Sequence, residues 1–171
     1  MEKLIYSIFN KIFMNEVESE LLEYFGDEKN KVIFDVGCFR GNFTKNIIKQ
    51  DFVPIVTPMG LDDKKQAYNI NADIAAGALA ISLKSRRLLL MTDVEGVYDK
   101  DKKLISEIKP VEAEKLIHDG TIKEGMIPKI KTCINAVESG VRGVVIIDGR
   151  RPHSILFELF SDEGAGTLIR K

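Results

Sequence analysis

Tryptophan is absent from this sequence and cysteine is scarce, and the scarcity of cysteine limits what the chain can be. Its two cysteines, Cys38 and Cys133, lie far apart and outside any C-x-x-C pattern. A disulfide framework of the kind found in small secreted domains is therefore excluded. No apolar run approaches the roughly 20 residues that cross a bilayer. Polar residues also interrupt the apolar N-terminus too early for a secretory signal, so we expect a cytoplasmic protein.

An excess of charge of either sign is also lacking. The 25 basic and 26 acidic side chains leave a formal net charge of -1 over 171 residues. Such a balance gives no general attraction to nucleic acid or to an anionic membrane surface, so neither is expected as a partner. The length is close to that of one ordinary domain and is sufficient to bury a hydrophobic core.

Hydrophobic periodicity predicts alternating strands and helices. Apolar spacing of three and four residues predicts an amphipathic helix over residues 2–24 that covers apolar surface. Continuous apolar runs typical of buried parallel strands occur further along. These patterns predict an α/β fold, a three-layer αβα sandwich with a mainly parallel sheet. The predicted strands are 32–36, 52–57, 87–91 and 143–147, with a final edge strand within 162–169, and the predicted helices are 73–83, 110–118, 130–139 and 154–160.

Three polar side chains recur two residues apart in the segment AYNINAD, residues 67–73. In an extended chain Asn69, Asn71 and Asp73 would leave the same face and could together grip a carboxylate or an ammonium group. We expect Asp73 to cap the helix that follows. The alternative is that these residues form only a turn and a helix cap.

Six segments in the same order, between Asp51 and Lys171, resemble the C-terminal half of acetylglutamate kinases, which are amino-acid kinases. They are FVPIVTPMG, AYNINAD, LLLMTDVEGVYDKDKKLISEI, EGMIPKI, VVIIDGRRPHSILFEL and DEGAGT. The resemblance implies an incomplete amino-acid kinase-like fold, with residues 51–171 forming the nucleotide-binding lobe and residues 1–50 a separate N-terminal part. It also implies transfer of a phosphoryl group from ATP, with Mg²⁺, to the side-chain carboxylate of N-acetyl-L-glutamate in arginine biosynthesis.

The same resemblance implies roles for individual residues. Asp73 and Lys129 match catalytic positions, and Asn69 matches a contact to the acetylglutamate substrate. The residues expected at the nucleotide are Asp93, Val94, Glu95, Gly96, Val97, Tyr98, Thr121, Ile122 and Lys123. A possible arginine effector site would comprise His153, Glu158, Glu163, Gly164 and Gly166, and the plain alternative is a helix followed by a glycine turn. The family also implies a homo-oligomer, while no metal-ligating residues are predicted.

Two further features concern loops. Glu124 stands where many relatives have glycine, close to the predicted phosphate region. Residues 32–49 carry a strand, a glycine loop and a helix, a combination that can hold an anion or a nucleotide. This stretch resembles the first motif of FkbM-type S-adenosylmethionine-dependent methyltransferases, in which Asp35, Gly37 and Gly41 would surround the cofactor. The second strand with a terminal acid, needed for the cofactor ribose, does not follow.

What the sequence lacks before Asp51 shapes the functional hypotheses. It has no K-x-G-G loop with a first catalytic lysine and no glycine-rich acceptor loop. We therefore expect a kinase-like protein that is truncated and weakly active or inactive alone. The strand at residues 32–36 is expected to take the place of the family's first strand, in the same sheet as residues 87–91 and 143–147. The alternatives are a methyltransferase fragment, or a non-catalytic module that binds a nucleotide or arginine.

Overall fold

The computed structural model describes residues 32–36, 53–61 and 66–171 of the chain. The chain divides into two compact units, Met1–Ala75 and Ala76–Lys171. In the first unit, strand β1 (Val32–Val36) pairs in parallel with β2 (Val53–Thr57), and β3 (Met59–Leu61) pairs antiparallel with β4 (Ala67–Asn69). The predicted helix at residues 2–24 and the loop and helix at residues 37–49 lie outside the described residues.

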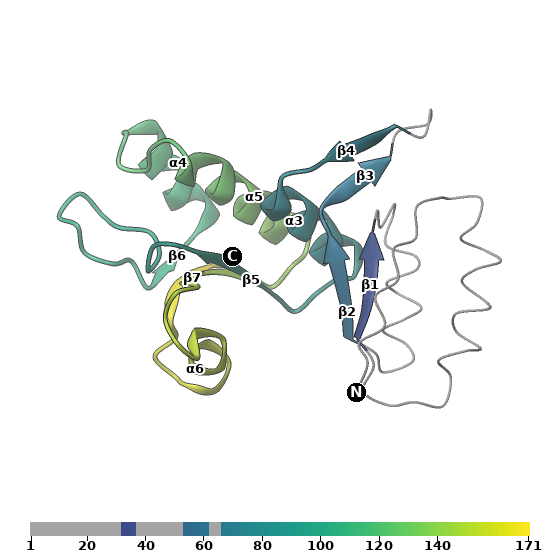
Figure 1. Cartoon of the computed structure of the whole chain (residues 1–171). Helices are drawn as coiled ribbons and strands as arrows, with labels where there is room; N and C mark the ends of the chain where they lie inside the picture. The colour runs from purple at the N-terminus through teal and green to yellow at the C-terminus, as the bar shows by residue number, and fades with distance from the viewer. Residues whose placement is uncertain (1–31, 37–52, 62–65) are drawn as a thin grey trace. The chain divides into compact units, whose positions relative to one another are not determined.

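The second unit contains a four-stranded sheet and is shown with the other elements in Figure 1. The strand order is β5-β7-β8-β6, in which β5–β7 and β6–β8 are parallel and β7–β8 is antiparallel. Its strands are β5 (Arg87–Thr92), β6 (Glu107–Ile108), β7 (Gly143–Asp148) and β8 (Gly166–Ile169). The helices are α3 (Ala72–Ser82), which crosses the boundary between the units, α4 (Pro110–His118), α5 (Met126–Glu138) and α6 (Ser154–Phe160).

The core of the second unit lies between the sheet and the helices α3, α4 and α5. Val144 and Ile146 of β7 point into this core, and they contribute to it together with Ile130 and Ile134 of α5. The remaining apolar residues of β7, Val145 and Ile147, are also buried. Figure 1 shows α5 and α6 on opposite sides of β7, which explains why this strand is apolar at nearly every position. The predicted α/β class with a mostly parallel sheet flanked by helices is confirmed.

The start of α3 differs from the prediction. The helix begins at Ala72, and its cap is Asn71, whose Oδ1 accepts the backbone N–H groups of Asp73 at 3.0 Å and Ile74 at 3.2 Å. Asp73 therefore lies in the first turn and is not the cap. Because β4 ends at Asn69 and the helix follows at once, Asn69, Asn71 and Asp73 do not share one extended face. Both Asn and Asp are good caps, so composition alone could not choose between them.

Three further predictions about elements are wrong. Helix α5 begins at Met126, because Pro128 falls in the first turn, where its missing N–H is not needed. Strand β8 is not an edge strand but lies between β7 and β6. Strand β1 pairs with β2 in a separate two-stranded sheet, so the described pairings do not include it in the sheet of β5 and β7.

Other predicted elements are confirmed. Helices α4 and α6 occur with the predicted bounds, and β7 extends the predicted strand by one residue. In the part of the chain that the structure describes, no helix combines the length and apolarity needed to cross a membrane.

Candidate functional site

Two loops leave the same edge of the four-stranded sheet. β5 and β7 are parallel neighbours whose last residues, Thr92 and Asp148, are paired. The backbone N–H of Gly149 donates to the Thr92 carbonyl at 2.8 Å, which holds the two loops together just beyond the strands. Ligands of open α/β sheets bind beyond the carboxyl ends of parallel strands, so this edge is the natural place for a nucleotide.

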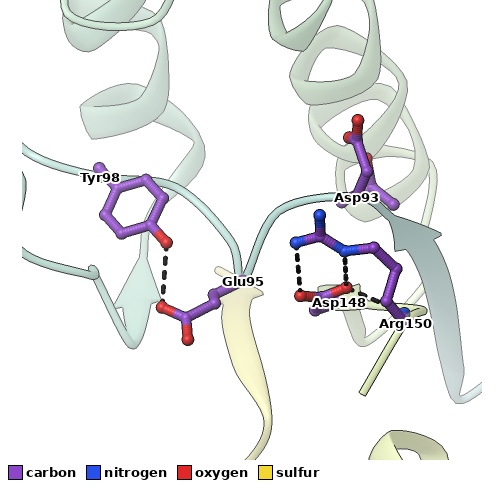
Figure 2. Close-up of polar contacts among 6 residues, drawn as sticks. Asp93, Glu95, Tyr98, Asp148 and Arg150 are labelled. Carbon is purple, nitrogen blue, oxygen red and sulfur yellow. Dashed lines mark hydrogen bonds and ion pairs between the residues drawn. The ribbon is translucent and has the colours of Figure 1, made fainter.

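Asp148 and Arg150 form a tight pair at this edge (Figure 2). The carboxylate accepts the Arg150 backbone N–H at 2.9 Å and the side-chain Nε and Nη2 groups at 3.0 and 2.9 Å. These hydrogen bonds lower the pKa of Asp148 to about 2. The pKa of Arg150 is raised, first by Asp148 and then by the charges of Asp93 and Glu95. The guanidinium therefore partly neutralises an edge that is otherwise acidic.

Glu95 and Tyr98 form a second polar contact in the same loop (Figure 2). The Tyr98 hydroxyl donates to Glu95 Oε2 at 3.0 Å, and this hydrogen bond raises the pKa of Tyr98 above its usual value. Gly96 and Val97 between them are buried, while Asp93 and Glu95 are exposed. The segment thus turns its charged side chains to solvent and its middle residues to the protein.

The second predicted nucleotide segment, Thr121–Lys123, follows helix α4. Asp119 accepts both the backbone N–H and the hydroxyl of Thr121, at 3.0 and 2.6 Å. It also pairs with Lys100 Nζ at 3.0 Å. These contacts, with the Thr121 hydroxyl first, lower the pKa of Asp119 to about 2. Because Lys100 belongs to the turn after Tyr98, Asp119 links the two predicted nucleotide segments.

The predicted residues of this segment differ in accessibility. Ile122 is 4% exposed and belongs to the hydrophobic core, so its side chain anchors the loop. Lys123 is exposed, and Thr121 is half-buried. Glu124, the next residue, has a φ of +42°, a backbone conformation that favours glycine.

The predicted catalytic and substrate residues lie in different units. Asn69 ends β4 and Asp73 lies in the first turn of α3, both in the first unit. Lys129 is half-buried near the N-terminal end of α5 in the second unit. Within the second unit, the structure brings Asp93, Glu95 and Tyr98 close to Asp148 and Arg150.

The predicted effector residues surround α6. Glu158 is 6% exposed; its Oε1 accepts Arg87 Nη1 at 2.8 Å, and its Oε2 accepts the Ala165 backbone N–H at 2.8 Å. Gly164 has a φ of +72°, which the turn after α6 requires. His153 and Glu163 are exposed, and Gly166 is half-buried. These contacts of Glu158 and Gly164 fit the helix-and-turn alternative, and the arginine effector site stays a prediction.

The sequence did not predict the hydrogen bonds and ion pairs made by four residues, Asp119, Asp148, Arg150 and Thr167. In the sequence, Asp119 follows a predicted helix, and Asp148 and Arg150 follow a predicted strand. A usable signal was present for the last two, because they directly follow a buried strand, where ligand-facing residues of parallel sheets occur. Thr167 gave no such signal.

The chemistry of the edge suits hydroxyl and amino groups better than phosphate. The exposed carboxylates of Asp93 and Glu95 can accept hydrogen bonds but repel anions. Across residues 32–36, 53–61 and 66–171, no group of three His, Cys, Asp or Glu side chains is arranged to hold a metal ion.

Comparisons with known proteins agree with this fold. The acetylglutamate kinase of Pelagibacter ubique (strain HTCC1062) is 52% identical over 147 residues, which cover 84% of this chain and 51% of that protein. The acetylglutamate kinase of Nitrobacter winogradskyi is 56% identical over 125 residues, 73% of this chain and 42% of that protein. The chain therefore spans about half the length of the curated relatives it matches.

Solved structures show the same architecture. N-acetylglutamate synthase from Neisseria gonorrhoeae, complexed with coenzyme A and N-acetyl-glutamate, superposes with a TM-score of 0.71 at 26% identity, covering 77% of this chain and 30% of that one. Carbamate kinase from Giardia lamblia bound to AMP-PNP superposes with a TM-score of 0.60 at 24% identity, covering 77% of this chain and 44% of that one. At this identity the similarity is evidence for the fold and not for a function.

A family model also matches the sequence directly. The model of the amino acid kinase family covers residues 14–148, so the match begins well before Asp51 and includes the stretch that resembles a methyltransferase motif. The division of the chain near residue 50 stays a prediction. On this match and on the relatives above, the chain belongs to the amino acid kinase family.

Proposed function

We propose that this chain is the nucleotide-binding part of an acetylglutamate kinase-type enzyme. The reaction would transfer a phosphoryl group from ATP to the side-chain carboxylate of N-acetyl-L-glutamate, in arginine biosynthesis. The observation that carries this proposal is the identity of 52–56% to proteins named acetylglutamate kinase over most of the chain. Cytoplasmic location and assembly into a homo-oligomer are part of the same proposal.

The nucleotide would bind at the carboxyl edge of β5 and β7. Exposed carboxylates there can accept hydrogen bonds from ribose hydroxyls, so we assign the nucleoside end of ATP to the Asp93–Tyr98 loop. The triphosphate, with Mg²⁺, needs positive charge. By resemblance, Lys129 offsets charge in the transition state and Lys123 ends a segment that lines ATP, so we assign these two lysines to the triphosphate. Ile122 would support this segment from the core without touching the ligand.

The catalytic groups would act mainly by placing charge. Phosphoryl transfer depends on positioning and on stabilising negative charge at the transferring oxygens. In the proposal, Lys129 offsets that charge, Asp73 orients the lysine, and Asn69 holds the acetylglutamate. Turnover by this chain alone should be very low, since the sequence contains no K-x-G-G loop.

A non-catalytic module remains the second candidate, and a specific observation favours it. The predicted nucleotide segments Asp93–Tyr98 and Thr121–Lys123 both belong to the second unit, whereas the predicted acceptor contact Asn69 belongs to the first. Such a module would bind a nucleotide without turning it over. The methyltransferase alternative gains no support, because β2 ends at Thr57 without the expected acid.

Thermal unfolding with added ligands tests the proposal. A ligand at a hundred times its Kd stabilises a folded protein by about 2.7 kcal/mol, which is a shift of several degrees for a domain of this size. MgADP and MgATP should raise the Tm, and S-adenosylmethionine should not. Asp93→Ala should reduce the nucleotide shift. Asp162→Ala, which removes an exposed carboxylate after α6, is the matched control and should leave it unchanged.

The result also separates the candidates. A Tm shift with S-adenosylmethionine and none with nucleotide would replace the kinase proposal by the methyltransferase one. A nucleotide shift with slow phosphate release in a coupled assay with N-acetyl-L-glutamate, abolished in Lys129→Ala, would support the kinase proposal, and a nucleotide shift with no release above background would favour the non-catalytic module. A rate typical of the family, lost in Lys129→Ala, would contradict the expected low turnover.

A further inference from the structure

Thr167 of β8 makes two hydrogen bonds with its buried hydroxyl group. The side chain is 0% exposed. Its Oγ1 donates to the carbonyl of Ile105 at 2.6 Å and accepts the backbone N–H of Val97 at 2.8 Å. Val97 lies in the loop proposed to bind the nucleotide, and its own carbonyl accepts the N–H of Ile105 at 2.8 Å. One hydroxyl therefore joins both sides of the turn after β5 to the central part of the sheet.

Two glycines allow this close approach. A Cβ atom on Gly96 would collide with Oγ1 of Thr167 and would lie 3.1 Å from its backbone nitrogen. A Cβ atom on Gly166 would collide with the Ile146 carbonyl and lie 2.9 Å from the carbonyl of Glu95. The backbone of residues 95–97 thus rests directly on β8, without side chains in between.

We propose that Thr167 is a positioning residue for the nucleotide loop. By accepting the Val97 N–H, the Thr167 hydroxyl fixes the position of the backbone of residues 95–97 relative to the sheet. The Glu95 and Tyr98 side chains on either side then face the ligand edge, where they are hydrogen-bonded to each other. This inference rests on the proposed nucleotide function and adds a residue that neither the resemblance nor the loop sequence assigns to it.

The contacts also connect α6 to the nucleotide loop. Glu158 of α6 holds the Ala165 N–H, and the chain then runs through Gly166 to Thr167. The segment that the resemblance assigns to an effector is therefore the physical support of the nucleotide loop.

A buried threonine could also serve only the stability of the core, and substitutions can separate the two roles. Thr167→Val keeps the shape but leaves the Val97 N–H and the Ile105 carbonyl without their partner. Thr167→Ser keeps the hydroxyl and loses only a methyl group. Ile169→Val removes a methyl group from a buried core side chain of the same strand and leaves the Thr167 hydroxyl in place.

Calorimetric titration with MgADP gives the first measurement. We expect Thr167→Val to raise the Kd by about tenfold, the effect of one buried donor left unpaired. Thr167→Ser and Ile169→Val should stay within about twofold of the wild type. A folded Thr167→Val protein with the wild-type Kd would overturn the proposal. If Thr167→Val does not fold, Thr167→Cys, whose thiol is a weaker hydrogen-bonding group, replaces it in the same comparison.

The second measurement is amide hydrogen exchange at Val97 in the absence of nucleotide. Exchange should be faster in Thr167→Val than in Thr167→Ser, while amides in α5 keep their wild-type rates. Equal exchange at Val97 in the two variants would overturn the positioning role. If the wild type does not bind MgADP, the proposed function fails, and this exchange measurement still decides whether Thr167 fixes the loop.

Discussion

The guanidinium of Arg87 and the carboxylate of Glu158 form an ion pair across the second unit, with Nη1 and Oε1 2.8 Å apart. Arg87 starts β5 and Glu158 lies in α6, so the pair fastens the helix to the sheet. The carboxylate is nearly buried, with 5% of its side chain exposed against 37% for Arg87. A free arginine could use this carboxylate only by displacing the chain's own arginine.

Loss of Glu158 should therefore destabilise the fold. Glu158→Ala leaves both Arg87 and the Ala165 N–H without an acceptor, and we expect a cost of about 2–3 kcal/mol in the free energy of unfolding. Arg87→Ala should cost about 3 kcal/mol or more, because it leaves the nearly buried Glu158 carboxylate without its counter-charge. Urea unfolding measures both. Arg170→Ala is the control. It breaks the ion pair between Arg170 and Glu107, whose side chains are 54% and 45% exposed respectively, and should cost under about 1 kcal/mol. Equal costs for Glu158→Ala and Arg170→Ala would contradict this account.

Replacing Glu124 by glycine should preserve or increase the stability of the fold. Its φ of +42° is unfavourable for a residue with a side chain, by about 1–2 kcal/mol. Glycine removes that strain but loses about 0.4–1 kcal/mol through the greater freedom of the unfolded chain. We expect Glu124→Gly to leave the free energy of unfolding unchanged or to raise it by about 1 kcal/mol. Gly120→Ala is the opposite test: its φ is +76° with open space around it, so alanine there should destabilise. A clear loss of stability in Glu124→Gly would show that the carboxylate has a favourable role.

Acid should weaken the link between the two nucleotide segments. The pKa of Asp119 in the folded state is about 2, below its usual value of 3.8, with the Thr121 hydroxyl as the largest cause. A lowered pKa stabilises the fold above the unfolded value, and this contribution disappears as the pH falls from about 4 towards 2. Asp119→Asn should therefore make the Tm less dependent on pH between 4 and 2, measured in low salt. A variant with the same pH dependence as the wild type would mean that the Asp119 contacts do not persist in solution.

Tyr98 should titrate at a higher pH than an ordinary tyrosine. Its hydroxyl donates to Glu95, and ionisation would place a second negative charge beside that carboxylate, so the pKa is raised. The favourable contribution is present below the usual pKa and is lost as the pH rises through the folded-state value. NMR titration of the tyrosine rings should show this delay for Tyr98, and Glu95→Gln should reduce it. Identical titration in both proteins would rule out the hydrogen bond.

Local patterns in the sequence predicted most of the individual elements. The apolar run at β7 and the proline that starts α4 identify a strand and a helix without any knowledge of their neighbours. Such signals depend only on nearby residues. The order of strands depends on distant residues, so the sequence predicts an edge strand at the C-terminus although β8 lies between β7 and β6.

The site was harder to predict than the fold for the same reason. Asp93 and Tyr98 could be named because the family resemblance covers their loop. Thr167 acts on Val97, 70 residues away in sequence, and only the packing of β8 under the loop brings them together. Arg150 was missed because a turn after a strand usually has no further role.

Gly96→Ala offers the most direct test of that packing. An added Cβ would collide with Thr167 Oγ1 and lie 2.9 Å from Leu104 Cδ1, and although the leucine can move, the backbone nitrogen of Thr167 at 3.1 Å cannot. We expect a loss of about 1–3 kcal/mol in the free energy of unfolding, typical of overpacking. Gly125→Ala, where nothing lies within 4 Å, is the control and should be neutral or slightly stabilising.

A double-mutant cycle then assigns the cost of Gly96→Ala to its partner. Thr167→Ala removes the hydroxyl that the new methyl group would strike, so the double variant should be more stable than the sum of the two single changes predicts. Residues in contact usually show coupling of about 0.5–3 kcal/mol in such cycles. Urea unfolding of the four proteins gives the coupling directly. Additive effects would mean that residues 95–97 do not rest on Thr167 in solution, and the loop would then need another support.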